Sequence, residues 1–250
     1  MQEAAPRRGP SAAMLRATLI ATMVVLGVAA VVHLVRYALL IINRSVLLNK
    51  LVAFGATWLG VLVSVIALFM VVATAVVLTN WLIARRAAAF AYHGSEDPRR
   101  LWALRAGCLV PVVNLFWAPV FVLELAGVEE RLTWLRRPIV VWWIVWFFST
   151  AVSLFSIATS FTKDSQGIAD NTVTTIVAYL LALAALVLAM KVFLGFERQP
   201  VERPTTRWVI VRDEEAAHAD REEPAAVEKQ TEPEAEPATA VESEGQNPAA

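Results

Sequence analysis

Four long apolar blocks dominate the sequence, near residues 17–42, 51–83, 139–161 and 173–193. Each reaches or exceeds the roughly 20 residues that a helix needs to cross about 30 Å of hydrocarbon. Hydrophobic residues make up 58% of the chain, and most charged residues of its first 196 positions lie between the blocks. Because lipid offers no hydrogen bonds to the backbone, such blocks must be helical. The sequence predicts an all-α integral membrane protein built as a helical bundle.

A fifth apolar segment, within residues 98–128, contains residues that disfavour a plain lipid-facing helix. Pro111 and Pro119 each lack the N–H that continues a helix. Asn114 and Glu124 are polar, and an uncompensated carboxylate in lipid costs roughly 2.5 kcal/mol or more. The segment is therefore expected to be broken and to be covered by protein or by water.

The local sequence also predicts where the helices of this segment begin and end. Asp97 has the side chain of a good N-cap, and Pro98 suits the first helical position. A helix is expected from Pro98 towards Val110, followed by a break at Pro111. Asn114 is expected to cap the freed backbone groups and to restart a helix.

Positive charge selects between two topologies, because cytoplasmic flanks retain Lys and Arg. If the fifth segment crosses the membrane, 9 basic residues fall inside and 11 outside; if it enters and returns, 16 fall inside and 4 outside. We therefore expect four spans plus one Pro-broken re-entrant or interfacial segment, with both termini cytoplasmic. Five spans remain the alternative.

Charge and composition divide the chain into three regions. Residues 1–16 form a cytoplasmic N-terminus, residues 17–196 the helical membrane domain, and residues 197–250 a tail with 14 acidic residues, 6 basic residues and six prolines. Such a composition predicts disorder. Arg outnumbers Lys, and Ala and Val are plentiful, which is typical of a GC-rich genome. The expected location is the cytoplasmic membrane of a bacterium.

The polar residues of the apolar segments are the candidate functional residues. Asn114 and Glu124 either line a polar site, or Asn114 caps a kink while Glu124 pairs with Arg131 or a neighbouring arginine. His33 lies inside the first span, where an imidazole either relays protons or only forms a hydrogen bond with Ser64 or another span residue.

Three stretches together resemble the bacterial domain of unknown function 4328 family of membrane proteins: "WLIARRAAAF", "PVVNLFWAPVFVLEL" and "PIVVWWIVWFF". The matching residues are Pro111, Asn114, Leu115, Glu124, Trp142 and Trp143. The chain departs from the family pattern in lacking aromatic residues before Pro111 and in placing Pro119 five positions after Asn114 rather than four. The resemblance implies a membrane fold and names no reaction.

No nucleotide-binding, metalloprotease or serine-hydrolase motif is present, so we expect no enzyme and no cofactor. One cysteine and three scattered histidines also predict no metal site. The expected function is that of a non-enzymatic envelope scaffold or regulator; the alternative is a small transporter or channel with a polar path at the broken segment.

The expected partners are the bilayer, a protein that binds the tail, and a second copy of the chain, with no nucleic acid. The arginines expected to contact anionic lipid are Arg85, Arg86, Arg99, Arg100, Arg136 and Arg137.

Overall fold

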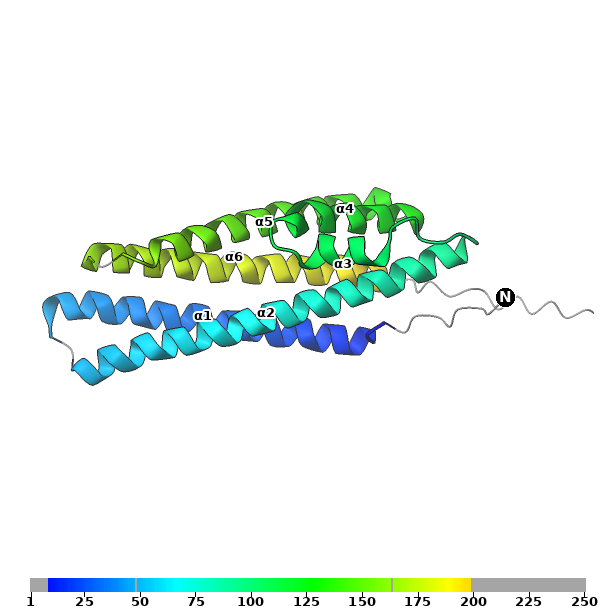
Figure 1. Ribbon diagram of the computed structural model, residues 1–250. Coiled ribbons are helices and arrows are strands. Elements are labelled where there is room, and N and C mark those ends of the chain that lie inside the picture. The colour runs from blue at the N-terminus through cyan, green and yellow to red at the C-terminus, as the bar shows by residue number, and fades with distance from the viewer. Residues whose placement is uncertain (1–8, 48, 163, 199–250) are drawn as a thin grey trace, which may run out of the picture. The chain divides into compact units, whose positions relative to one another are not determined.

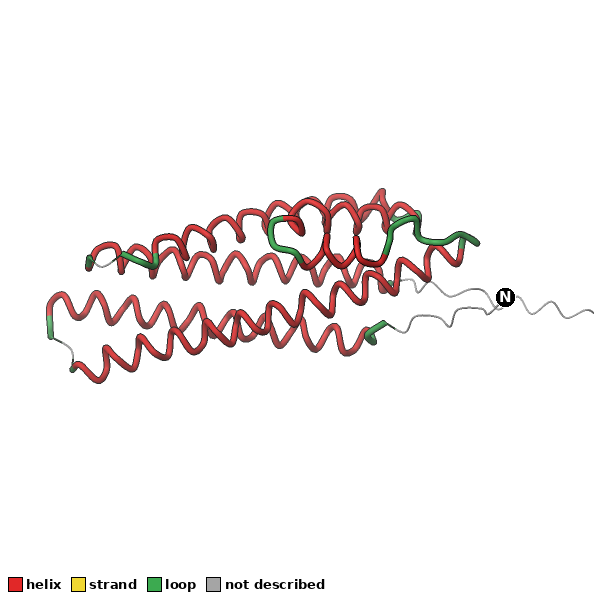
Figure 2. The backbone as a smooth tube through the Cα atoms, viewed as in Figure 1, coloured by secondary structure: helices red, strands yellow, loops and turns green. Residues whose placement is uncertain are grey.

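The computed structural model describes residues 9–47, 49–162 and 164–198, and all regular structure in this part of the chain is helical. Figure 2 shows the helices and the short loops between them. The six helices are α1 (Ala12–Ser45), α2 (Lys50–Tyr92), α3 (Leu101–Leu109), α4 (Val113–Val128), α5 (Leu132–Thr159) and α6 (Ser165–Glu197). Of the predicted tail at residues 197–250, Glu197 belongs to α6 and residues 199–250 lie outside the described part, as do the first eight residues.

Four of these helices, α1, α2, α5 and α6, are long and apolar enough to cross a membrane. They have 34, 43, 28 and 33 residues. At 1.5 Å per residue they measure about 40–65 Å, which exceeds the roughly 30 Å of a hydrocarbon core. The predicted all-α class with four membrane helices is confirmed.

The long helices pack in the order α2, α1, α6, α5. The start of α1, the end of α2, the start of α5 and the end of α6 lie together on the right of Figure 1. Leu15 packs there against Phe193, and Leu82, Leu135 and Phe196 share a buried cluster. We call this the arginine end, because it carries the arginine-rich segments. At the opposite end, the loop end, Arg44 donates to Gln166 at 3.0 Å.

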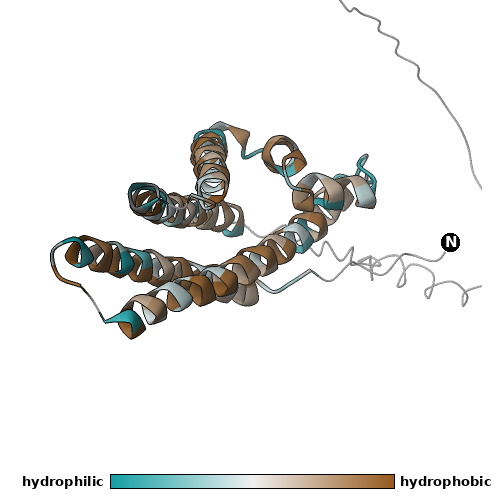
Figure 3. Ribbon diagram, turned by 60° about the vertical axis from the view of Figure 1, so that its left-hand side comes forward, coloured by the Kyte–Doolittle hydropathy of each residue, from teal (hydrophilic) through white to brown (hydrophobic). Residues whose placement is uncertain are grey.

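Hydrophobic residues predominate along the helices, as the brown parts of the ribbons in Figure 3 show. Large side chains such as Val24, Phe69 and Phe155 are exposed, which is what helices in contact with lipid require. Inside, hydroxyl groups join neighbouring helices: Thr22 contacts Thr74 at 2.7 Å between α1 and α2. Hydrogen bonds of this kind help hold membrane helices together.

The Pro-broken segment forms the hairpin of α3 and α4, which lies beside α2 and α5 (Figure 1). Gly107 of α3 faces α4 so closely that an added Cβ would lie 2.6 Å from a ring carbon of Phe121. Near the base of the hairpin, Arg99 contacts Glu124 at 2.6 Å. With only 16 residues, α4 is also shorter than the roughly 20 needed to span. The segment therefore returns to the end where it began, and the five-span alternative is not supported.

The hairpin turns at Pro111, as predicted, but its details differ from the prediction. Val112, not Asn114, is the N-cap of α4, with φ 69° and ψ −49°. The N–H of Val113 donates to the carbonyl of Pro111 at 2.8 Å, which closes a γ-turn. A positive φ is strained for a β-branched residue. Asn114 contributes its backbone N–H, which donates to Val110, and no hydrogen bond to its side chain is found in the described ranges.

The start of α3 also differs from the prediction. The helix begins at Leu101 rather than Pro98, and its N-cap Arg100 has no side-chain cap. Asp97 accepts a hydrogen bond from the backbone N–H of Arg99 at 2.9 Å. Its carboxylate also binds Arg86, so an ion pair replaces the predicted helix cap.

Pro119 does not interrupt α4, which continues through it. A helical N–H at position 119 would have bonded to the carbonyl of Leu115. The indole N–H of Trp143, on α5, donates to that carbonyl at 2.7 Å instead. A side chain from a neighbouring helix thus satisfies the backbone group that the proline leaves free.

Candidate functional site

The charged residues of the arginine end gather around two consecutive arginines, Arg85 and Arg86, near the end of α2. A 43-residue helix is longer than a span requires, so it can carry these arginines beyond the apolar stretch. Being consecutive, they point in different directions from the helix. Each therefore organises its own set of partners.

The first set, the Arg86 cluster, consists of Arg86, Asp97, Arg99 and Glu124. The Arg86 side chain is fully buried, and its Nε and Nη2 donate to the two oxygens of Asp97 at 2.8 and 2.9 Å. Its Nη1 donates to Glu124 and to the carbonyl of Phe121, both at 3.1 Å. Glu124 also accepts from Arg99 at 2.6 Å.

Aromatic rings complete the surroundings of Arg86. Its guanidinium carbon lies 5.5 Å from the ring centre of Phe90 and 5.8 Å from that of Phe121. Rings at such distances attract a cation through their negative faces. The charge of Arg86 is thus balanced by carboxylates and flanked by rings, which is how a buried guanidinium is tolerated.

The electrostatics of this cluster act on Asp97. Partial burial by itself would raise the pKa of this carboxyl. The hydrogen bond from Arg86, the backbone N–H of Arg99 and the charges of both arginines outweigh it and hold the pKa below its ordinary value. Asp97 is therefore an anion at neutral pH.

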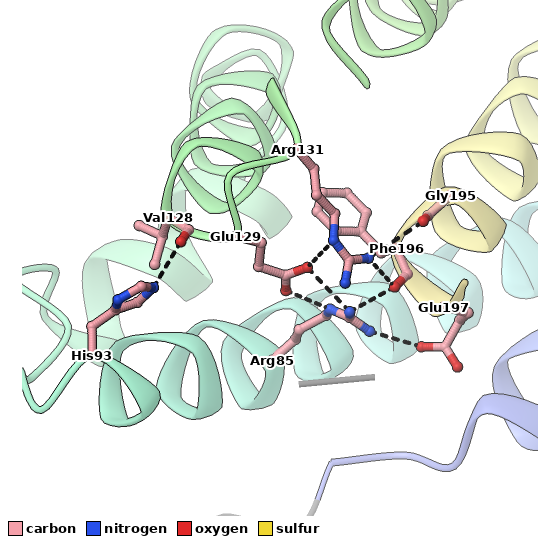
Figure 4. A network of polar contacts seen from close by, with 8 residues as sticks. All are labelled: Arg85, His93, Val128, Glu129, Arg131, Gly195, Phe196 and Glu197. Carbon is pink, nitrogen blue, oxygen red and sulfur yellow. Dashed lines mark hydrogen bonds and ion pairs between the residues drawn. The ribbon is translucent and has the colours of Figure 1, made fainter. Parts of the chain in front are cut away.

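The second set, the Arg85 cluster, consists of Arg85, Glu129, Arg131 and Glu197 (Figure 4). Arg85 binds Glu129 at 2.7 Å and Glu197 at 3.0 Å, and Arg131 lies 3.3 Å from Glu129. Arg85 and Arg131 also donate to the backbone carbonyl of Phe196, at 2.6 and 2.5 Å. The last carbonyls of a helix have no partners within it, so two arginines from elsewhere cap the C-terminus of α6.

Each cluster contains two arginines and two carboxylates, so each is balanced in charge. Together they tie α2 to the loop before α3, to α4, to the start of α5 and to the end of α6. Such an arrangement fixes the relative positions of helices. Its carboxylates face arginines at short distance, which does not favour a role as general bases.

A depression of about 530 Å³ lies next to the Arg86 cluster. Its lining residues are Phe90, Pro98, Arg99, Glu124, Gly127 and Val128. The side chain of Glu124 is 31% exposed, so the depression reaches this carboxylate, which the sequence predicted to be a candidate functional residue. The depression opens beside α4 at the arginine end.

The structure does not bring the predicted site residues together. Asn114 is ten residues from Glu124 along α4, or about 15 Å at 1.5 Å per residue. His33 contacts α2 and α6 instead of α4. Pro111 forms the hairpin turn and Pro119 is buried within α4. Glu124 pairs with neighbouring arginines, as one prediction held, but Arg131 is not among them.

The arginines predicted to contact lipid fall into two groups. Arg85 and Arg86 have side chains that are 9% and 0% exposed and are held by carboxylates, so they are not free to contact headgroups. Arg99 is partly exposed but bound to Glu124. Three further arginines, Arg100, Arg136 and Arg137, are exposed and form no ion pair with any described residue.

Sequence reasoning missed the structural roles of Arg85, Arg86 and Trp143. One signal was present: between residues 85 and 138 eight arginines are accompanied by five carboxylates. Carboxylates in so apolar a setting need partners. The opposing charges within this module could have suggested that Arg85 and Arg86 form ion pairs, as was considered for Glu124.

No metal-binding group of three or more His, Cys, Asp or Glu occurs among the residues described. The cysteine, Cys108, is buried in α3. Burial raises the pKa of its thiol to about 11, which keeps it protonated and unreactive at neutral pH.

The model of a family described as "Domain of unknown function (DUF4328)" matches residues 44–198, more than half of the chain. No curated protein and no solved structure matched it.

Proposed function

The chain belongs to the DUF4328 family, and we propose that it is a non-enzymatic scaffold or regulatory protein of a bacterial cytoplasmic membrane. In this proposal the arginine end faces the cytoplasm and both termini lie there. The charge count supports the orientation, since it assigns 16 basic residues to this side and 4 to the other.

The observation that carries the proposal is the environment of Glu124. Its two oxygens are bound by Arg86 and Arg99 at 3.1 and 2.6 Å. A carboxylate on a transport path must exchange its partners for a substrate. A carboxylate bound by two arginines is suited to holding helices in place rather than to exchanging partners, which favours the scaffold proposal over the transporter.

The same end offers a surface for anionic lipid. Four exposed arginines, Arg100, Arg105, Arg136 and Arg137, form no ion pair with other described residues. Basic side chains next to a cytoplasmic leaflet each contribute about 1 kcal/mol of attraction to anionic headgroups. The arginine end would thus hold anionic lipids and leave the acidic tail, outside the described residues, for a protein partner.

Native mass spectrometry of the protein released from nanodiscs of mixed phosphatidylglycerol and phosphatidylcholine tests the lipid contact. Replacing Arg100, Arg105, Arg136 and Arg137 by Gln is expected to lower the retained fraction of phosphatidylglycerol at least several-fold. The control replaces two basic residues at the loop end, Arg44 and Lys50, by Gln and should leave the retained fraction nearly unchanged. Equal retention in both variants would contradict the lipid-binding part of the proposal.

The alternative, a small transporter or channel, draws its support from the depression beside Glu124. Under this alternative Glu124→Gln abolishes a solute or ion flux in proteoliposomes. Under the scaffold proposal the same change weakens the Arg86 cluster and leaves no flux to lose. A flux that requires Glu124 would therefore replace the scaffold by the transporter.

A further inference from the structure

A polar cluster joins three helices inside the bundle, far from the two arginine clusters. It consists of His33 on α1, Ser64 on α2 and Tyr179 on α6. His33 is 4% exposed, and its Nε2 lies 3.2 Å from the hydroxyl oxygen of Ser64. The hydroxyl of Tyr179 donates to the same oxygen at 2.8 Å, and the two rings stack at 5.5 Å. The predicted contact between His33 and Ser64 is confirmed.

The hydrogen bonds of Ser64 determine the tautomer of His33. A hydroxyl has one proton to donate and two lone pairs to accept with. Ser64 donates to the carbonyl of Gly60 at 2.8 Å and accepts from Tyr179. It can therefore only accept from His33, so Nε2 carries the proton and Nδ1 is a bare acceptor.

That acceptor has no donor. Nδ1 of His33 is buried and finds no hydrogen-bond partner among the described residues. Buried polar atoms are normally satisfied, and each exception needs an explanation. A lone pair that is kept free on an imidazole is a site at which a proton can bind.

The cluster lies deep in the bundle. His33 is 12 residues from the end of α1 at Ser45, or about 18 Å, and Tyr179 is 14 residues from the start of α6, or about 21 Å. The ends of these long helices extend beyond a hydrocarbon core of about 30 Å, so His33 and Tyr179 both lie inside that core. An ionisable residue at such a place points to function.

The charged surroundings of His33 oppose a second positive charge. Arg36, one turn along α1, lies beside it: a Cβ on Gly60 would be 3.5 Å from Cε1 of His33 and 3.9 Å from Nη1 of Arg36. Among the described residues, the polar side chains found against the imidazole from the other helices are the neutral Ser64 of α2 and the neutral Tyr179 of α6. In the described part of the chain, no carboxylate pairs with either His33 or Arg36.

We propose that His33 is a proton-binding site whose protonation loosens α1 from α2 and α6. The neutral ring completes the three-helix contact. An added proton on Nδ1 creates an N–H that lacks an acceptor and a cation next to Arg36, so the ring must turn or the helices must shift. This inference is independent of the scaffold proposal, because it concerns residues inside the bundle that contact neither arginine cluster.

Nitrogen NMR of the full-length protein in lipid tests proton binding. The His93→Gln, His218→Gln variant leaves His33 as the one histidine of the chain, and the protein is prepared without a histidine tag. At about pH 8 the shifts should show a neutral ring protonated at Nε2, and an imidazolium should appear as the pH is lowered through the acidic range. A ring that stays neutral throughout, or that carries its proton on Nδ1, overturns the proposal.

A distance measurement tests the coupling to packing. Spin labels at Ile41→Cys on α1 and Val173→Cys on α6, both exposed, report the separation of these helices in a Cys108→Ser background. The distance should change by about 1–2 Å or more over the same pH range and with the same midpoint. The change should disappear in His33→Gln and persist in His93→Gln. A change that survives in His33→Gln, or protonation without any change, contradicts the proposal.

Discussion

Several charged side chains at the arginine end are buried, and each of them lies in an ion pair with a side chain of opposite charge. Glu129 shows this most clearly, since its side chain is 3% exposed and lies between Arg85 and Arg131. Removing one partner of a buried ion pair leaves an uncompensated charge, which costs more than the pair itself contributes. Glu129 is therefore expected to tolerate neutral substitution poorly.

Glu129→Gln is expected to lower the free energy of unfolding by about 3–5 kcal/mol, because two arginines lose their shared anion. Chemical unfolding in detergent, followed by tryptophan fluorescence, measures the change. The neighbouring Glu130 is exposed and in no described ion pair, so Glu130→Gln should change stability by less than about 0.5 kcal/mol. Similar losses in both variants would show that the Arg85 cluster does not stabilise the fold.

Asp97 should make stability depend on pH. Its pKa is lower in the folded protein than its ordinary value of 3.8, so the anion favours folding at any pH above that value. The contribution of the Asp97 anion to the free energy of unfolding shrinks as the pH falls below about 4, towards the pKa of Asp97 in the folded protein. Asp97→Asn should thus be less stable than the parent at neutral pH, on the order of 3 kcal/mol, because Arg86 is buried.

The difference between the Asp97→Asn variant and the parent should narrow on acidification. Unfolding midpoints of both proteins, measured between about pH 7 and pH 3, give this difference directly. A difference that stays constant with pH would mean that Asp97 is not held as an anion by Arg86.

Among the helices, α4 depends on a neighbour for its continuity through Pro119. The indole of Trp143 donates to the carbonyl that the proline leaves free, at 2.7 Å. Trp143→Phe should cost about 1–3 kcal/mol, because a buried acceptor loses its donor. In a Pro119→Ala background the helix supplies its own N–H to Leu115, and the same replacement should cost less. A double-mutant cycle measures this coupling, and additive effects would refute it.

The hairpin of α3 and α4 depends on the missing side chain of Gly107. An added Cβ would lie 2.6 Å from Phe121 and 3.1 Å from Trp117, so Gly107→Ala should cost about 1–3 kcal/mol by overpacking. Gly127 offers a matched control on α4, since nothing lies within 4 Å of its added Cβ. Gly127→Ala should be neutral or stabilising, as alanine favours helices. Thermal unfolding of the Gly107→Ala and Gly127→Ala variants gives their melting temperatures. An equal change of melting temperature in both variants would argue against close packing in the hairpin.

For the whole molecule, the arrangement requires the segments before α3 and at the start of α5 to face the same side of the membrane. In a Cys108→Ser background, cysteines at Arg100 and Arg136 should react with an impermeant maleimide from one side only. A cysteine at Leu47, which is 94% exposed in the loop between α1 and α2, should react from the other. Labelling of residues 100 and 136 from opposite sides would restore the five-span alternative.

The sequence by itself determined the features that depend on neighbouring residues along the chain. Block length and hydropathy predicted the four membrane helices, and the missing N–H of Pro111 predicted the break between α3 and α4. The charge count predicted that this segment returns, because it compares the flanks of each span. The contact between His33 and Ser64 was within reach because their helices are consecutive.

The tertiary structure decided which distant groups meet. Glu124 lies 38 residues from Arg86, Trp143 28 residues from Leu115, and Tyr179 115 residues from Ser64. Such pairs depend on which helices are neighbours and on how each is rotated about its axis, and no local pattern encodes either. Two of the arginines predicted to contact lipid, Arg85 and Arg86, lie in buried ion pairs for that reason: the sequence gives the charge of a residue, but packing decides its partner.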